Sequence, residues 1–286
     1  MKILNTIPEA REFRRSFADE TLGLVPTMGY LHEGHLELVR RARAENARTA
    51  VSIYVNPTQF GPTEDLSRYP RDVDHDLQLL ATEGVDMVFI PTDGTMYPPD
   101  FQTKVRVATV TQMLEGERRP THFEGVTTVV AKLFNIIQPV KAYFGQKDAQ
   151  QVVVIRQMVR DLNFPLEIVV CPTVREADGL AMSSRNKYLN DEQRRAAPVL
   201  FRSLGQVATL WATGERNTDV LHAALLRSLS DEPLARVDYV SLADPVTLEE
   251  YKSLIPNDSG VLVSMAVFFD RTRLIDNIIL KAPNET

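Results

Sequence analysis

The sequence predicts an α/β protein in which a domain built on a parallel sheet precedes a smaller α+β domain. Up to about residue 175, apolar runs alternate with segments of helical periodicity, the pattern of a parallel sheet covered by helices on both faces. After this point, helical segments come before mostly consecutive apolar runs. We therefore expect one domain over residues 1–175 and a second over residues 176–286.

The first domain is expected to alternate strands with helices. Short apolar runs predict strands, and apolar residues three to four apart predict helices. Asn56-Pro57 and Pro91 end two of the runs, because these residues favour turns. The expected strands are 22–25, 50–55, 85–90, 142–144 and 166–170. The expected helices are 35–45, 72–82, 125–138 and 150–162, and the clearest apolar stripe is formed by Val126, Val129, Val130, Leu133 and Ile137.

The second domain is expected to begin with helices and to end with strands. Helices are predicted around residues 191–205 and 220–230. The apolar runs near 237–242, 260–268 and 274–280 predict strands. No internal repeat or low-complexity segment interrupts this pattern.

Composition narrows the class of protein. A chain with 44% hydrophobic and 24% charged residues is an ordinary globular protein. It has neither an apolar run of roughly 20 residues nor an N-terminal signal-peptide core, and its single cysteine, Cys171, excludes an internal disulfide framework. We therefore expect a cytoplasmic enzyme with no membrane partner. The net charge of −6 argues against a dedicated nucleic-acid binder.

The segment from Pro26 to His35 carries the strongest chemical signal. Gly29 allows a tight turn after the predicted strand, and Gly34 allows a phosphate to approach the backbone. The start of the following helix offers N–H groups to an anion, and His32 and His35 can donate to phosphate oxygens from the same side. The alternatives are a capping or surface role, or metal ligation by the pair, for which no third ligand is evident.

Two further turns carry polar side chains. Asn56–Gly61 follows a predicted strand, and its amide side chains suit a polyol or acid substrate, although a plain turn would have the same composition. In Arg118–Gly125, Arg119 is a forked donor for phosphate or carboxylate unless it is an ordinary solvated charge.

A strand-to-helix turn at Gly145–Gln151 adds a cation. Lys147 can neutralise phosphate, Asp148 can accept from an amine or cap the helix, and Gln151 lies one turn further on. Val129 and Val130 of the preceding helix can be core or pocket residues.

The segment Met182-Ser183-Ser184-Arg185 brings two hydroxyls and a guanidinium. These groups form a good triphosphate clamp, and the nearby Gly179 would permit loop closure. Alone, a Ser-Ser-Arg tripeptide is a weak signal, because it occurs by chance. Together with the histidine segment it indicates a nucleotide triphosphate site with attack at the α-phosphate.

At this point the residues resemble a known family. His32-Glu33-Gly34-His35 resembles the HIGH motif of the class I aminoacyl-tRNA synthetase and nucleotidyltransferase superfamily, and Met182-Ser183-Ser184-Arg185 resembles its KMSKS loop. Longer strings, in order along nearly the whole chain, are similar to the pantothenate synthetase (pantoate–β-alanine ligase) family: Pro26–Gly29, Val55–Phe60, Tyr69–Arg71, Pro120–Val126, Phe144–Asp148 and Arg175–Asn186.

The resemblance implies a two-step, ATP-dependent ligase of pantothenate (vitamin B5) biosynthesis. Pantoate would attack the α-phosphate of Mg-ATP to give pantoyl adenylate and pyrophosphate, and β-alanine would then displace AMP. The family further implies a homodimer whose subunits have a Rossmann-like first domain and a C-terminal lid domain carrying the KMSKS-like loop. Mg²⁺ would accompany ATP as cofactor.

The resemblance also implies roles for individual residues. The catalytic set would be His32, His35, Lys147, Ser183 and Arg185. ATP would contact these and Pro26, Thr27, Met28, Gly29, Gly34, Gly145, Gln146, Asp148, Val174, Met182 and Ser184. Pantoate would contact Met28, Gln59, Val129, Val130 and Gln151. Asn56 and Asp148 would lie near the amine or the ribose, and Arg119 could contact an anion.

The chain departs from the family pattern in two places. His75 stands where an acidic residue is common, so we assign no protein ligand to Mg²⁺. Phe268-Phe269-Asp270 replaces a smaller, glycine-containing turn, which concerns the packing of the second domain. Two other functions remain as alternatives: a simple adenylyltransferase acting on a phosphate substrate, and a non-catalytic RNA-binding relative, which the acidic charge disfavours.

Overall fold

The protein is described here by a computed structural model covering residues 1–62 and 64–282, and it separates into two compact units. The first unit comprises Met1–Gln146 and Gln150–Pro172. The second comprises Lys147–Ala149 and the chain from Thr173 onwards. The short stretch from Lys147 to Ala149 therefore belongs, by its contacts, with the later part of the chain.

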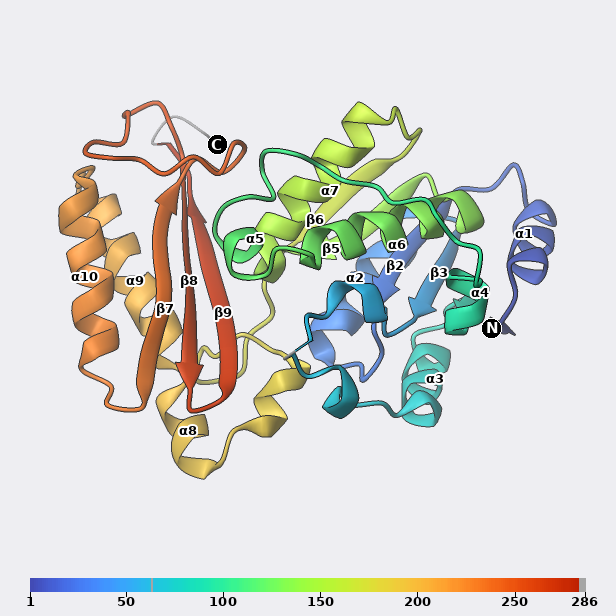
Figure 1. The fold of residues 1–286 in the computed structure, drawn as a ribbon, viewed down its shortest axis with the longest axis horizontal. Coiled ribbons are helices and arrows are strands. Elements are labelled where there is room, and N and C mark those ends of the chain that lie inside the picture. The colour runs from blue at the N-terminus through green and yellow to red at the C-terminus, as the bar shows by residue number, and fades with distance from the viewer. Residues whose placement is uncertain (63, 283–286) are drawn as a thin grey trace. The chain divides into compact units, whose positions relative to one another are not determined.

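The first unit is built on a six-stranded sheet in the order β1-β4-β3-β2-β5-β6 (Figure 1). Every pairing in it is parallel, which confirms the predicted fold class. The strands are β1 (Lys2–Leu4), β2 (Leu22–Thr27), β3 (Arg48–Ile53), β4 (Met87–Phe89), β5 (Lys141–Gly145) and β6 (Glu167–Cys171). The chain order reverses between β2 and β5, and ligands of such sheets bind beyond the carboxyl ends of the strands at this point.

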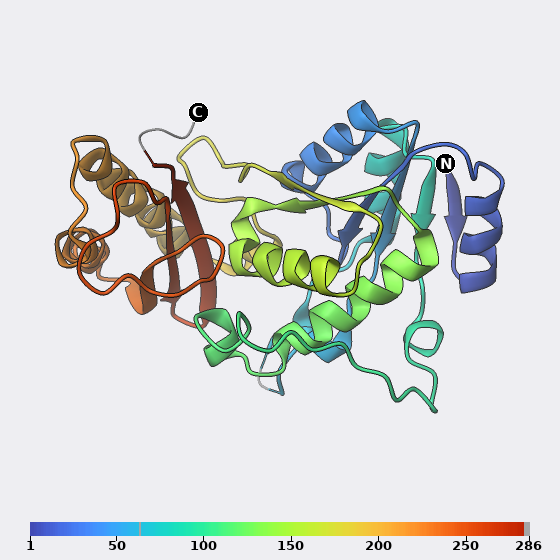
Figure 2. The same cartoon turned by 90° about the horizontal axis from the view of Figure 1, so that it is seen from above.

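Helices cover both faces of this sheet. Figure 2 shows α2 on one side of the strands and α6 and α7 on the other. On the α2 side the core joins buried residues of β2, β3 and β4 to Val39 and Leu80. The helices are α1 (Ile7–Arg15), α2 (Glu33–Glu45), α3 (Val73–Thr82), α4 (Asp93–Met96), α5 (Glu115–Arg118), α6 (His122–Ile137) and α7 (Ala149–Asp161).

The first elements of the chain were not among those expected. β1 is a three-residue edge strand, too short for its alternation to be read. α1 had a readable start signal, because Thr6 and Glu9 form a capping box and Pro8 lies in its first turn. Ala10 is the one buried residue of α1, which explains why apolar periodicity did not reveal this helix.

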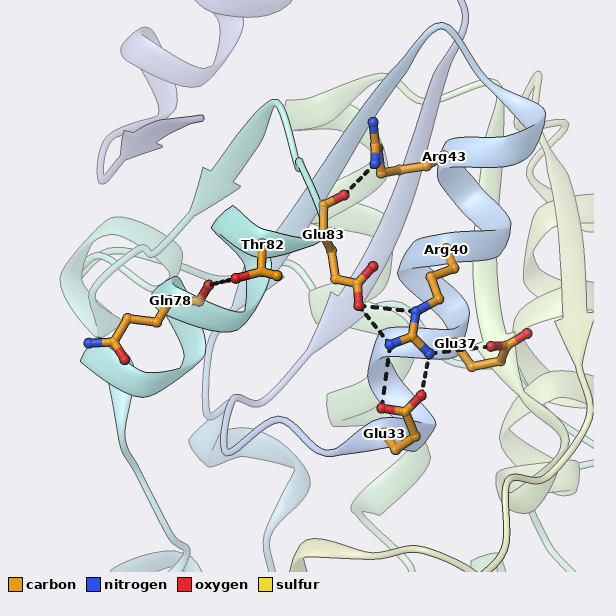
Figure 3. Close-up of polar contacts among 7 residues, drawn as sticks. All are labelled: Glu33, Glu37, Arg40, Arg43, Gln78, Thr82 and Glu83. Carbon is orange, nitrogen blue, oxygen red and sulfur yellow. Dashed lines mark hydrogen bonds and ion pairs between the residues drawn. The ribbon is translucent and has the colours of Figure 1, made fainter.

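Surface charges join α2 to the end of α3 (Figure 3). Arg40 pairs with Glu33 and Glu37 of its own helix and reaches Glu83, the residue that caps α3, at 2.7 Å. Arg43 donates to the Glu83 carbonyl oxygen at 2.6 Å. Ion pairs between such partly exposed side chains typically contribute only about 0–1 kcal/mol to stability.

The second unit packs two helices on one face of an antiparallel sheet. Its strands β7 (Ala235–Ala243), β8 (Val261–Phe269) and β9 (Thr272–Leu280) pair in that order. α9 (Val199–Ala212) and α10 (Thr218–Ser230) lie together against it (Figure 2). The shorter α8 (Asp191–Ala196) precedes them.

One predicted helix, 191–205, is wrong in its extent. The structure has two helices there, α8 ending at Ala196 and α9 running on to Ala212. Pro198 lies at the junction, where its ring and missing N–H prevent a continuous helix and where it can precede a new first turn.

Candidate active site

A buried carboxylate shapes the loop that follows β2. Both oxygens of Asp76, on α3, accept backbone N–H groups, from Tyr30 at 2.8 Å and from Leu31 at 2.7 Å. Burial raises the pKa of Asp76, against the effect of these two donors. Tyr30 has a φ of 52° and Gly29 one of 78°, so the turn is tight and left-handed. The two hydrogen bonds to Asp76 therefore hold this strained turn just before the histidine motif.

The two predicted histidines start α2 and touch each other. His32 is the N-cap and its Nδ1 accepts the Gly34 N–H at 3.2 Å, while Nδ1 of His35 accepts the His32 N–H at 3.3 Å. Their ring centroids lie 4.1 Å apart. Because both Nδ1 atoms act as acceptors, the proton of each neutral ring lies on Nε2. The capping role, expected as an alternative, thus coexists with a pair of Nε2–H donors at a helix N-terminus.

Amide side chains after β3 form a buried network. Asn56 is 1% exposed and donates to the Gln59 side-chain oxygen at 3.0 Å and to the Gly125 carbonyl at 3.1 Å. Its own oxygen accepts from Thr58 and from the Tyr97 hydroxyl. These bonds engage the whole amide of Asn56, so its geometry supports Gln59 rather than presenting a donor to a ligand.

Gln59 is held from several sides. Its Nε2 donates to the sulfur of Met28 at 3.2 Å, and its backbone oxygen contacts Nδ1 of His122 at 2.9 Å. α6 can approach this closely because residue 125 is glycine: a Cβ there would lie 2.5 Å from the Thr58 oxygen. The Gln59 side chain is consequently fixed beside the end of β2.

Arg119 is engaged by Glu64 through two hydrogen bonds, of 2.7 and 2.6 Å. Burial alone would raise the pKa of Glu64, but the ion pair with Arg119 holds it below its usual value. The Arg119 guanidinium also donates to the backbone oxygen of Gln59, at 3.5 Å. In this arrangement Arg119 braces the loop that carries Gln59, and contact with an anion would require the Glu64 pair to open.

His122 is neutral at physiological pH, because burial and the charge of Arg119 lower its pKa to about 4. An unfolded histidine titrates near 6.5, so between these values the unfolded chain binds the extra proton. The stability associated with the neutral His122 ring is therefore fully present above about pH 6.5 and is lost as the pH falls towards 4. We expect the free energy of unfolding to drop by about 2 kcal/mol from pH 7 to pH 5 on this account. Urea unfolding of wild type and His122→Gln at both pH values measures it, and an equal drop in the variant would contradict the assignment.

A cavity of about 840 Å³ opens beyond the carboxyl ends of β2, β3 and β4. Its lining includes Met28 and Gly29 of the predicted set, together with Tyr54, Phe60 and Asp76. This volume is of the size that encloses small organic ligands. Gln59, Val129, Val130 and Gln151 do not belong to its lining.

The other predicted pantoate contacts lie on α6 and α7. Val129 and Val130 are buried on α6, a helix with buried side chains around most of its circumference. Gln151 is half-buried on the first turn of α7. The neighbouring Gln150 is a buried scaffold residue, which accepts from Glu115 N–H and donates to the carbonyls of Val110 and Met113.

In the second unit, Lys147 is fixed through its backbone. Its carbonyl accepts a hydrogen bond of 2.8 Å from the side chain of Asn277, on β9. Its side chain is 20% exposed, and Nζ lies 3.8 Å from the Asp148 carboxylate. The Lys147 cation is thus carried on an anchored turn.

The loop from Val174 to Arg185 is closed at its base. The Arg175 side chain forms a double ion pair with the buried Asp276. The backbone of Arg175 forms an isolated antiparallel β-bridge with that of Ala181. The Val174 carbonyl accepts the Met182 N–H at 3.0 Å. Beyond this base, the Ser183 hydroxyl caps a 3₁₀ turn by accepting the Arg185 N–H at 3.3 Å.

The predicted set is therefore assembled within each unit. In the first unit, the carboxyl ends of the adjacent strands β3, β2 and β5 lead into the predicted segments 56–59, 26–29 and 145–146. The second holds Lys147, Asp148, Val174 and Met182–Arg185. Asp76, Asp276 and Asn277 support these segments and were not among the predicted site residues. For Asp76 a signal existed, since acidic residues cluster at the start of a predicted helix.

Comparison with known proteins gives a match over nearly the whole chain. The family model for pantoate-beta-alanine ligase matches residues 2–279. The chain belongs to the pantoate–β-alanine ligase family. The ligase activity predicted from the motifs is confirmed at the level of this family.

Individual members of the pantoate–β-alanine ligase family are similar to this chain in sequence and in structure. The chain is 60% identical over 281 residues to a pantothenate synthetase of Chloroflexus aurantiacus, covering 98% of this chain and 99% of that one. The crystal structure of pantothenate synthetase from Thermus thermophilus superposes with a TM-score of 0.91 at 47% identity, covering 97% and 99% of the two chains. The Francisella tularensis enzyme, complexed with β-γ ATP and β-alanine, has a TM-score of 0.80 at 34% identity over 98% and 97%.

Two general features complete the description of this family member. Among residues 1–62 and 64–282, no helix is long and apolar enough to span a bilayer. The same residues contain no group of three or more histidine, cysteine, aspartate or glutamate side chains arranged to hold a metal ion.

Proposed function

We propose that this chain joins pantoate to β-alanine in two steps at the carboxyl edge of its parallel sheet. In the first, a pantoate carboxylate oxygen attacks the α-phosphorus of ATP, the bond to the β-phosphate oxygen breaks, and pyrophosphate leaves. In the second, the β-alanine amine attacks the acyl carbon, AMP leaves with its phosphate oxygen, and the amine releases a proton to solvent. The products are pantothenate, AMP and pyrophosphate.

The single observation that carries the first step is the histidine pair at the start of α2. With Nδ1 of each ring engaged as an acceptor, the two Nε2–H groups would donate to a phosphate bound at the positive end of the α2 dipole. The equatorial oxygens of a five-coordinate phosphorus gain charge, so donors fixed in advance lower the barrier. Pro26, Thr27, Met28 and Gly29 bring the backbone to the nucleotide, and Gly145 and Gln146 do so from the end of β5.

Pantoate recognition is assigned to the first unit. Gln59, oriented by Asn56 and Met28, would bind the polar end of the acid, and Gln151 would bind it from α7. The sulfur of Met28 and the methyl groups of Val129 and Val130 would surround its apolar part. For Asn56 and Arg119 the contacts favour positioning of Gln59 over direct binding.

The second unit would supply cationic and hydroxyl groups. Lys147, Ser183 and Arg185 would bind the phosphates and the transition state, with Ser184 and the backbone of Met182 and Val174 beside the nucleotide. Asp148 would accept from the ribose or from the β-alanine amine. We assign this unit, Lys147–Ala149 with the chain from Thr173 onwards, as the lid domain.

The residues present are compatible with Mg²⁺ held chiefly by its substrate. Asp76 uses both oxygens on backbone donors, and Asp72 caps α3 by accepting the His75 N–H. Mg²⁺ commonly keeps waters and phosphate oxygens as ligands, which requires few protein groups. When bound with ATP, the ion would neutralise phosphate charge. A cytoplasmic homodimer completes the proposal by analogy with the family.

The decisive experiment follows pyrophosphate release from ATP and pantoate, with and without β-alanine, together with mass analysis of the product. A stoichiometric burst with pantoate alone, becoming turnover and pantothenate when β-alanine is added, is the expected result. Turnover that is indifferent to the amine would instead indicate an adenylyltransferase, and no pantoate-dependent burst would contradict the proposal.

Replacing Gly125 by alanine should disturb both stability and pantoate binding. The new Cβ would lie within 2.6 Å of backbone atoms of Thr58 and Gln59, which cannot move away as a flexible side chain would. We expect a loss of about 1–3 kcal/mol in unfolding free energy and a raised KM for pantoate. Gly205→Ala is the matched control, because a Cβ there meets nothing within 4 Å and should stabilise α9 slightly. Urea unfolding and pantoate titration of both variants distinguish the two sites, and equal behaviour would refute the packing argument.

A further inference from the structure

A buried amide of β9 lies against the backbone of the proposed catalytic lysine. Asn277 is 4% exposed, and its Nδ2 donates to the Lys147 carbonyl at 2.8 Å. The two residues are 130 positions apart in the chain, yet both belong to the second unit. The bond therefore fixes the turn that carries Lys147 to the sheet of that unit.

The neighbouring residue fixes Asn277 in turn. Asp276 is 2% exposed, and its Oδ1 accepts the backbone N–H of Asn277 at 2.8 Å. Arg175 holds the same carboxylate at 2.6 and 2.9 Å. Consecutive residues of a strand point to opposite faces, so β9 reaches the base of the Ser183–Arg185 loop with one side chain and the Lys147 turn with the next.

We propose that Asn277 is a positioning residue for Lys147 in the adenylation step. The inference rests on the proposed function. A cation stabilises the transition state only if its Nζ lies within a fraction of an ångström of its productive position, and a misplacement of 1 Å can cost about 10²-fold in rate. Asn277 achieves this by anchoring the Lys147 backbone to a strand that is paired along its length with β8.

An isosteric variant removes the bond with little change in shape. Asn277→Leu has no donor for the Lys147 carbonyl, and Asn277→Ala serves as a smaller replacement should the leucine variant fold poorly. Ser264→Ala is the matched control. Ser264 pairs directly with Asn277 across β8 and β9, and its buried hydroxyl has no hydrogen-bond partner among the described residues.

The readout is the split between rate and binding in pantoate-dependent pyrophosphate release. For the folded Asn277 variants we expect kcat for this step to fall about 10- to 100-fold, as is usual for residues that orient an active group, with the KM for pantoate changed less than twofold. Ser264→Ala should keep both parameters near wild type. An unchanged kcat in a folded Asn277 variant, or an equal loss in Ser264→Ala, would overturn the proposal.

A double-mutant cycle with Lys147→Ala separates positioning from a general structural effect. If Asn277 acts through the lysine, its replacement should lower the residual rate of Lys147→Ala by less than about twofold, because no cation remains to be positioned. If the two losses multiply, Asn277 acts elsewhere and the proposal fails. Wild-type enzyme that showed no pantoate-dependent release would instead count against the proposed function, so the two failures are distinguishable.

Discussion

Lys147→Ala is expected to lower the rate of pantoyl adenylate formation by at least about 10²–10³-fold while the protein remains folded. Its charge would neutralise phosphate oxygens as the fifth bond to phosphorus forms, and no neighbouring cation of the same turn can replace it. Its backbone is anchored by Asn277 independently of the side chain, so the truncated variant should keep the local fold. Single-turnover pyrophosphate release with pantoate measures the effect.

A lysine outside the proposed site provides the control for Lys147. Lys141 lies at the start of β5 and pairs with Glu45 at 3.0 Å. Lys141→Ala removes a similar side chain and two partly exposed ion pairs, with Glu45 and Glu167, so it should cost stability slightly and leave the rate unchanged. Lys147→Arg keeps the charge but alters its shape, and it should retain part of the activity. Turnover like that of wild type in Lys147→Ala would remove this residue from the mechanism.

His32→Asn should reduce the rate of the first step by about 10²–10³-fold, because it removes the Nε2–H donor. Asparagine is also a strong N-cap and can still accept the Gly34 N–H that His32 now accepts through Nδ1. The variant therefore distinguishes the capping role from the catalytic one. Stopped-flow pyrophosphate release and thermal unfolding, measured on the same protein, give the two effects separately.

Comparison with alanine variants sharpens this experiment. His32→Ala loses both the cap and the donor, so it should match His32→Asn in rate but be less stable by about 1 kcal/mol. His222→Ala, on α10, is the control for loss of an imidazole outside the site. A His32→Asn variant with altered pantoate affinity but an unchanged rate of adenylation would contradict the phosphate role.

Local patterns predicted most of the elements that position the site. The strand before Pro26 and the helix after His32 were readable because apolar periodicity and glycine turns act within a few residues. The parallel sheet followed from their alternation. Boundaries were less accurate where a cap decides them: α2 begins at Glu33, two residues before the predicted start, because His32 caps it.

The site was predictable as a set of segments, and less so as a set of contacts. Motifs selected Gln59, Lys147 and Ser183 as candidates, because their residue types suit the proposed chemistry. They did not distinguish a side chain that can bind a ligand from one already engaged. Asn56 and Arg119 carry suitable groups, yet in the folded protein these groups hold Gln59 and Glu64.

Residue type and short-range spacing were enough to predict the fold class and the family, and to select the candidate site residues. The residues that support these candidates could be recognised only in the folded protein. Asp76 clamps the turn before His32, and Asn277 anchors Lys147 from 130 positions away. Such contacts form when distant segments bury polar groups that must then find partners, and no local pattern records which partner they find.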